Sequence, residues 1–185
     1  MIRMMMSFHI ALSLTQPWAS LVAIGAKRFE TRKWKTNYRG PLLIHAAQRM
    51  PVQARRLALE EPFLSALRDT YWHIRGRVIA MVNLVDCIEI GAGLGPIKPM
   101  TPDQIRNEMA FGDWRPGRYA WRFDDVVRFP EPFYHKGFLG LFNVHEYAVM
   151  LATELWEKHP EWYSGPCQCK ACLVKAGSVF QKVHT

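Results

Sequence analysis

The chain lacks the features that would place it in a membrane or outside the cell. Among its 185 residues, no apolar run approaches the roughly 18–20 residues that a membrane-spanning helix needs. The start, Met-Ile-Arg-Met-Met-Met, has no apolar core and no small-residue cleavage site, so a signal peptide is not expected. Four cysteines are too few for a disulfide scaffold at this length. We therefore expect a cytoplasmic protein without a membrane partner.

Acidic residues are scarce relative to basic ones. The chain has 16 Asp and Glu against 24 Lys and Arg, which gives a net charge of +8. Such a balance favours an acidic partner, with nucleic acid ahead of an anionic membrane surface. A hydrophobic content of 49% with 22% charged residues is typical of a folded domain with a core and excludes a disordered tail protein.

The positive charge is concentrated between residues 25 and 40. This segment of 16 residues has a net charge of +5, because Glu30 is its only acid. The basic residues are Lys27, Arg28, Arg32, Lys33, Lys35 and Arg39, and Phe29, Trp34 and Tyr38 lie among them. Basic and aromatic side chains together are typical of a surface that contacts phosphates and bases. The alternative is a solvated edge strand, in which lysines prevent aggregation.

Hydrophobic periodicity predicts an α+β fold with five or six strands and three or four helices. We expect strands ending near Ser13 and over 28–35, 40–47, 76–90, 117–123 and 140–144. We expect helices from Pro17 to a stop at Gly25, over 51–68 with a break at Pro62, from Thr101, and over 145–158. Strands and helices do not alternate strictly, which disfavours a parallel α/β sheet and favours a small closed or half-closed barrel.

The segment Gly25-x-Lys27-x-x-Glu30-x-Arg32 resembles the signature of the ASCH domain (activating signal cointegrator-1 homology) of the PUA-like superfamily. The flanks Gln-Pro-Trp-Ala (16–19) and Tyr-Arg-Gly-Pro-Leu-Leu-Ile-His-Ala (38–46) fit the same family in the same order. The resemblance implies a small PUA-like β-barrel with helices packed around it, and a cleft lined by the signature. It also implies binding of RNA or another nucleic acid. We divide the chain into an ASCH domain, residues 8–145, and a C-terminal helix and cysteine-containing tail, residues 146–185.

The predicted nucleic-acid-binding residues follow from this signature and from the basic run. They are Gln16, Trp18, Lys27, Glu30, Arg32, Lys33, Lys35 and Arg39. Strand alternation places Glu30 and Arg32 on one face, where arginine can bind phosphate and the carboxylate can accept from a base amino group. Two structural alternatives remain: Glu30 in a plain ion pair, and Trp18 in the core.

The alternative function is a small hydrolase, an amidohydrolase or nuclease acting on modified nucleosides or RNA. Family members that hydrolyse amides use the signature lysine with a threonine three residues later, whereas here Glu30 follows Lys27 at that spacing. Thr31 is one step away and faces the other side of the strand. A hydrolase would therefore depend on Lys27 and Glu30 as an acid–base pair, and no catalytic residue is otherwise assigned. A third hypothesis is a protein-interaction module formed by helix 145–158 and the tail.

The tail carries three thiols in six residues, Cys167, Cys169 and Cys172. A tetrahedral zinc site needs a fourth ligand, for which His159 and His184 are candidates. The second Cys-x-x-Cys pair of a typical zinc module is missing, so the alternative is a reduced cluster without metal. No other cofactor is expected. The partner is RNA, another nucleic acid or a nucleoside-like molecule, and the sequence leaves the oligomeric state open.

Overall fold

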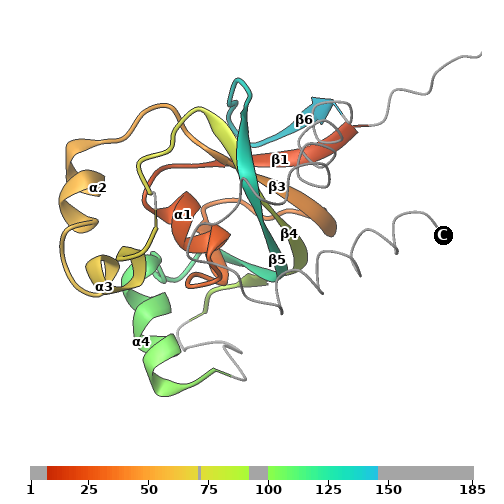
Figure 1. Ribbon diagram of the computed structural model, residues 1–185. Coiled ribbons are helices and arrows are strands. Elements are labelled where there is room, and N and C mark those ends of the chain that lie inside the picture. Colours follow the sequence, from red (N-terminus) through yellow and green to blue (C-terminus); the bar gives the residue numbers. More distant parts are fainter. Residues whose placement is uncertain (1–7, 71, 92–99, 146–185) are drawn as a thin grey trace, which may run out of the picture.

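The computed structural model describes residues 8–70, 72–91 and 100–145 (Figure 1). In chain order the elements are β1 (Phe8–Leu14), α1 (Trp18–Ala23), β2 (Phe29–Arg32), β3 (Gly40–Ala46), α2 (Val52–Leu57), α3 (Phe63–Leu67), β4 (Arg77–Glu89), α4 (Pro102–Phe111), β5 (Tyr119–Tyr134) and β6 (Leu141–His145). The α+β class is confirmed, and the six described strands agree with the predicted five or six.

The six strands form one mixed sheet in the order β2-β5-β4-β3-β1-β6. Only β1 and β3 are parallel, and every other neighbouring pair is antiparallel. The strands β2 and β6 are the two ends of this order and are not paired with each other, so the described sheet is not closed and the predicted barrel is not confirmed. Because β2 has only four residues, its free edge is short. A side-chain bond from Arg32 to the carbonyl of Ser13, 3.0 Å long, connects β2 to the end of β1 instead.

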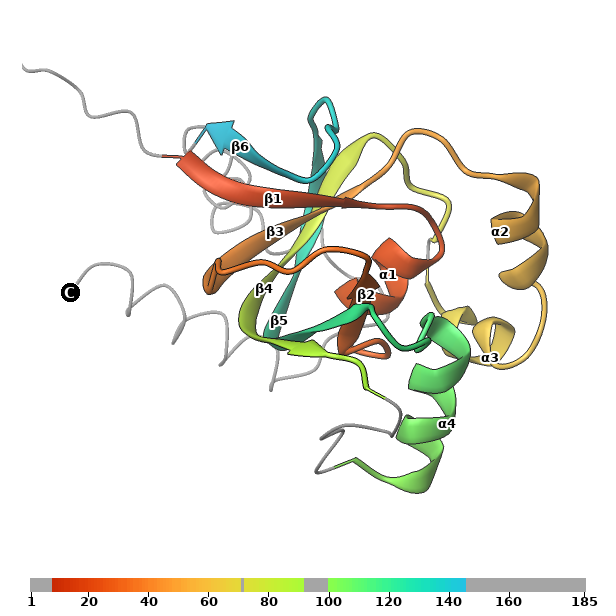
Figure 2. The ribbon, with the colours of Figure 1, turned by 180° about the vertical axis from the view of Figure 1, so that it is seen from behind.

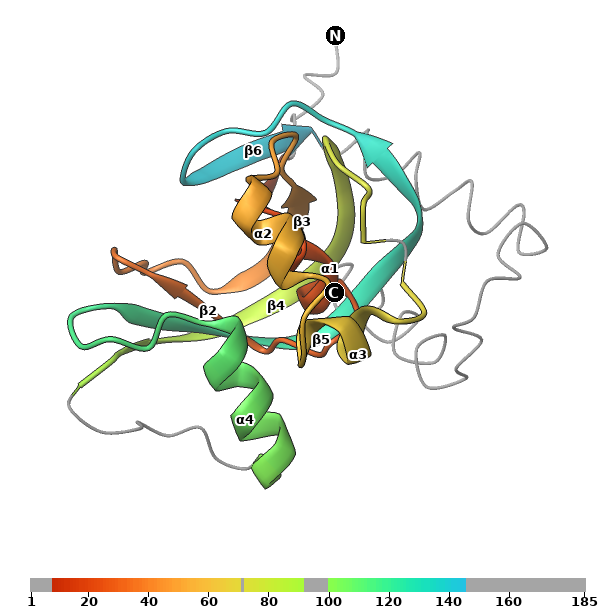
Figure 3. The ribbon, with the colours of Figure 1, turned by 90° about the vertical axis from the view of Figure 1, so that its left-hand side faces the viewer.

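The sheet curves around α1, which lies against its concave face (Figure 3). Ala19 and Val22 of α1 are completely buried there. The strand residues of the same core are Leu12, Leu14, Leu42, Ile44, Ala46, Ile79, Ala80, Val82, Leu84, Cys87, Trp121 and Phe123. Alternate residues of the same strands, such as Ala11 and Leu43, belong to a second core on the opposite face. Both faces are therefore covered, which explains why β3 and β4 are almost continuously apolar.

Helices α1 to α4 begin or end close to the glycine, proline and threonine residues from which the sequence predicts these boundaries. Gly25 follows α1 with φ +74, a conformation that glycine adopts without strain. The helical stretch 51–68 is divided at Pro62 into α2 and α3. Thr101 caps α4 through a capping box with Gln104.

Helices α2, α3 and α4 gather beside α1 at one side of the sheet, and the opposite views of Figures 1 and 2 agree on this. A separate core joins them, because Leu21 of α1 packs with Phe63 and Leu67 of α3 and Phe111 of α4. None of the helices in the described part of the chain is long and apolar enough to cross a membrane.

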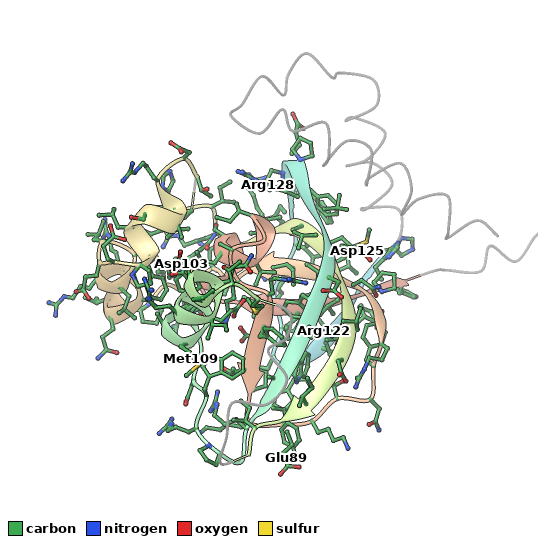
Figure 4. All side chains as sticks on the ribbon, turned by 90° about the horizontal axis from the view of Figure 1, so that it is seen from below. Glu89, Asp103, Met109, Arg122, Asp125 and Arg128 are labelled. Atoms are coloured by element: carbon green, nitrogen blue, oxygen red, sulfur yellow. The ribbon has the colours of Figure 1, made fainter. Side chains whose placement is uncertain are left out.

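Two strand boundaries differ from the prediction. The strand expected over 28–35 ends at Arg32, and the strand expected over 117–123 continues to Tyr134. The extension of β5 contains two prolines and two consecutive aspartates, which disfavour a strand by local propensity. Pairing with the long strand β4 overrides that propensity. Side chains of Arg122, Asp125 and Arg128 mark the course of β5 in Figure 4. His145, the expected first residue of the helix 145–158, is instead the last residue of β6, and the rest of that predicted helix and the cysteine tail lie outside the described residues.

Candidate functional site

The strand β2 places Glu30 and Arg32 side by side on one face. Its burial alternates, with Phe29 and Thr31 buried and the two charged residues half-buried. The Nε of Arg32 lies 3.0 Å from Oε1 of Glu30, in an ion pair whose side chains are 27% and 13% exposed. The predicted alternation of this strand and the predicted pairing of Glu30 are therefore present.

These two residues form one wall of a cleft of about 340 Å³. The other lining residues come from the end of β1, the start of α1, and α2 with the residue before it: Ser13, Leu14, Thr15, Trp18, Pro51, Gln53, Ala54 and Leu57. The lining combines one ion pair, neutral polar groups and apolar side chains. Such a mixture suits a ligand with a flat apolar ring and polar edges.

Trp18 combines an anchoring role with a place in the cleft wall. Its Nε1 donates to the carbonyl of Phe111 at 2.7 Å, and its ring meets Phe63 edge-on at 5.9 Å. The indole is therefore held by α3 and α4 while one side of it lines the cleft. Gln16, in contrast, is completely buried: its amide donates to the carbonyl of Ile74 and accepts from the N–H of Ser20. It supports the start of α1 and does not line the cleft.

Lys27 is inside the protein and not on the cleft surface. Its side chain is 1% exposed, and its Nζ has no hydrogen-bond partner in the described part of the chain. Burial lowers the pKa of Lys27 below its ordinary value of 10.5, while the negative charges of Glu30 and Glu108 oppose that effect. Glu30, which exerts the stronger of these two influences, is itself part of the cleft wall, so the Lys27 amine is electrostatically linked to the cleft although it does not line it.

Glu108 of α4 is the second buried charge. It is 0% exposed, its Oε1 accepts from the backbone N–H of Arg28, and its Oε2 has no partner among the described residues. Burial raises the pKa of its carboxyl above the ordinary value of 4.5, and Lys27 opposes this shift most strongly. The C-terminal part of α4 thereby fixes the segment that precedes β2. The Nε1 of Trp114 strengthens that arrangement by donating to the carbonyl of Glu108 at 2.8 Å.

The remaining basic residues of the run are not among the residues that line the cleft. Lys33 and Lys35 are exposed after the end of β2 and form no ion pair with a described residue. Arg39 donates to the carbonyls of Thr36 and Tyr38 and lies 3.5 Å from a carboxylate oxygen of Asp86. The run that looks continuous in the sequence is thus divided between the interior, the cleft wall and the outer surface.

Thr31 lies behind the strand, as its position beside Glu30 predicts. It is buried, and its Oγ1 accepts from the N–H of Asp113 at 2.9 Å. Its hydroxyl is therefore bonded to the loop after α4 on the face opposite the Glu30–Arg32 pair.

Sequence reasoning missed three contributors to the site: Glu108, the polar end of β1, and α2. A glutamate near the end of a short helix carries no signal of burial, and only packing against β2 shows its role. The alternation of Ser13, Leu14 and Thr15 at a strand end is a usable signal, because it places polar groups beside the signature helix.

Within residues 8–70, 72–91 and 100–145, no group of three or more metal-ligating side chains is present. The cysteine cluster of the tail lies outside these residues, so the possible zinc site stays a prediction.

The family model of the ASCH domain matches residues 12–114 of this chain. The chain belongs to the ASCH domain family. The matched part of this ASCH protein includes all of the cleft lining and Glu108, and it ends before β5 begins.

Activating signal cointegrator 1 from Homo sapiens and the protein of the same name from Mus musculus are each 35% identical to the chain over 89 residues. The alignment covers 42% of this ASCH protein but only 14% of either relative. Among solved structures, the chain resembles the crystal structure of ASCH from Zymomonas mobilis with a TM-score of 0.46 and 13% identity. That alignment covers 80% of this chain and 94% of the other.

Proposed function

We propose that this ASCH domain binds RNA, with a base in the cleft beside Glu30 and Arg32. The observation that carries the proposal is the half-buried ion pair on the cleft wall. Arg32 uses one Nη for the carbonyl of Ser13, and its other Nη forms no bond within the described residues. Apart from its ion pair with the Nε of Arg32, the carboxylate of Glu30 forms no hydrogen bond or ion pair within the described residues, so its other oxygen can accept from a ligand. The pair therefore leaves a donor and an acceptor side by side, which is the pattern that a base edge complements.

The surrounding charge supports the same function. Lys33 and Lys35 add exposed positive charge after the end of β2. Phosphate groups beside a bound base would be attracted to this region, and the affinity would fall steeply with salt.

The test is fluorescence polarisation of a labelled single-stranded RNA with the full chain, titrated across salt. We expect Arg32→Ala to weaken binding about tenfold, since it removes a charged donor from the cleft. Glu30→Gln should change the ranking among RNA homopolymers more than the mean affinity. Arg106→Ala is the matched control, because Arg106 also pairs with a carboxylate but lies on α4 and does not line the cleft. Equal affinities of wild type, Arg32→Ala and Glu30→Gln for every RNA would contradict the proposal.

One observation favours hydrolysis of a modified nucleoside or of RNA as a second candidate. Burial lowers the pKa of Lys27, and a neutral amine beside a carboxylate is a competent base. Against it, Lys27 is not among the residues that line the cleft. Chromatography of N-acylated nucleosides and RNA after incubation with the chain tests this candidate. Turnover that Lys27→Met abolishes in a folded protein would support it, and intact substrates would remove it.

A further inference from the structure

The helix α2 is a second wall of the cleft, opposite β2. Gln53, Ala54 and Leu57 all line the cleft, so this side of α2 faces the Glu30–Arg32 pair. Ala54 is buried and Leu57 is half-buried, which fixes the orientation of the helix. None of the eight binding residues predicted from the sequence comes from this wall.

The two arginines of α2 differ in position relative to the cleft. Successive residues of a helix are about 100° apart, and residues three apart are neighbours on its surface. Arg56 therefore lies beside Gln53 at the edge of the cleft. Arg55 lies about 160° around the helix from both Gln53 and Leu57, on the side away from these two lining residues. Both arginines are exposed.

Arg56 also differs from the arginines near the other wall in having no internal counter-charge. Arg28, Arg32 and Arg39 each lie within ion-pair distance of a carboxylate. The side chain of Arg56 forms no ion pair or hydrogen bond with any residue that the structure describes. Lys33, directly after the lining residue Arg32, and Arg56, beside the lining residue Gln53, are thus two exposed positive charges without an ion pair in the described part of the chain, one next to each wall.

The dimensions of the cleft limit what can enter it. About 340 Å³ lies at the lower end of the range for small-ligand sites, so the space suits one nucleoside and not a stacked pair. A base inside a duplex is paired and stacked and cannot reach into such a site without being extruded, which costs a few kcal/mol. A single strand supplies an unpaired base at little cost.

We propose that the cleft takes one unpaired nucleotide of single-stranded RNA and that the strand crosses the cleft mouth between Lys33 and Arg56. One of these residues binds the phosphate on the 5′ side of the inserted nucleotide, and the other binds the phosphate on the 3′ side. This inference rests on the proposed function and adds to it the strand state of the RNA and a binding residue on α2.

The experiment compares Arg56→Ala with Arg55→Ala, a matched pair that removes the same charge from the same helix. The probe is a fluorescein-labelled single-stranded RNA of mixed sequence, and the readout is the dependence of log Kd on log salt. Each phosphate contact to a single strand contributes about 0.7 to that slope. We expect Arg56→Ala to lower the slope by about 0.7 and to weaken binding about fivefold at roughly 0.1 M salt. Arg55→Ala should keep the wild-type slope and stay within about twofold of its affinity. Lys33→Ala should match Arg56→Ala, and fully paired RNA should compete poorly with the probe.

The outcomes separate this inference from the proposed function. Equal effects of Arg56→Ala and Arg55→Ala, with binding still lost in Arg32→Ala, would overturn the inference alone. Competition by duplex RNA as strong as that by single strands would also overturn it. Absence of RNA binding by the wild-type chain would overturn the proposed function, and the inference with it.

Discussion

The buried charges of Lys27 and Glu108 offer a sharp test of how the signature segment is held. Both side chains are excluded from solvent, and Nζ of Lys27 and Oε2 of Glu108 have no hydrogen-bond partner in the described residues. Each charge therefore depends on the field of nearby opposite charges. Glu108→Gln is the informative perturbation, because its amide oxygen can still accept from the N–H of Arg28 while the negative charge is removed.

The expected magnitude follows from the alternatives open to an uncompensated Lys27. Removing one partner of a buried charge pair costs about 3–5 kcal/mol. The ammonium can instead lose its proton, and moving from its ordinary pKa of 10.5 to pH 7 costs about 5 kcal/mol at about 1.36 kcal/mol per pH unit. We therefore expect Glu108→Gln to lower the free energy of unfolding by about 3 kcal/mol at pH 7. In Lys27→Met, Glu108 can take up a proton instead of remaining as an unpaired buried charge. Protonating a carboxyl of ordinary pKa 4.5 at pH 7 costs about 3 kcal/mol, which limits the loss of unfolding free energy in this variant to about that value.

The assay is urea unfolding of the full chain, followed by circular dichroism, for wild type, both single variants and Lys27→Met/Glu108→Gln. The double variant has neither buried charge, so its loss should be smaller than the sum of the single losses by at least about 1 kcal/mol. The exposed pair Asp103 and Arg106 on α4 is the control, with an expected coupling below about 0.5 kcal/mol. Additivity of Lys27→Met and Glu108→Gln within about 0.5 kcal/mol would refute the reasoning.

The two single variants should also differ in how their loss of unfolding free energy depends on pH. In Glu108→Gln the pKa of Lys27 falls further, so the unfolded state binds the proton more tightly, and the destabilisation decreases as pH rises toward 10.5. In Lys27→Met the pKa of Glu108 rises further, so the destabilisation is small near pH 4.5 and increases as pH rises. Between about pH 5.5 and about pH 9, the destabilisation relative to wild type should therefore decrease in Glu108→Gln and increase in Lys27→Met. A destabilisation that changes with pH in the same direction in both variants would contradict the assignment of a positive charge to Lys27 and a negative charge to Glu108.

Three further predictions concern the support around the site. Burial lowers the pKa of His45, whose Nε2 donates to the carbonyl of His135. The free energy of unfolding of the wild type should therefore fall as pH drops through about 6.5, and urea unfolding of His45→Gln should show a smaller fall. Gly137→Ala should lower the free energy of unfolding by about 1–3 kcal/mol in the same assay, since its Cβ would overlap Cε1 of His45 and lie 2.8 Å from Oγ of Ser13. Thr101→Ala, which removes the cap of α4, should cost about 1 kcal/mol, whereas Thr101→Ser should be nearly neutral.

Sequence patterns were sufficient where the cause is local. Gly25 ends α1, Pro62 separates two helices, and alternation places Glu30 beside Arg32 and Thr31 behind them. Each of these features depends on backbone sterics or on the two-residue period of a strand, and both act over a few neighbouring residues.

Patterns failed where long-range pairing or packing decides the outcome. The second half of β5 is a strand because it pairs with β4, despite its prolines and aspartates. The open sheet follows from which strands are neighbours, and spacing along one chain does not specify that order.

The sequence by itself determined the family signature, the basic character of the segment 25–40 and the residues able to contact a ligand. The tertiary structure decided which of them share a site. It placed the amine of Lys27 inside the protein, positioned Glu108 behind β2, bonded Arg39 near Asp86, and set α2 opposite the Glu30–Arg32 pair. The physical reason is that burial and charge pairing depend on residues brought together from distant parts of the chain, whereas sequence patterns report only near neighbours.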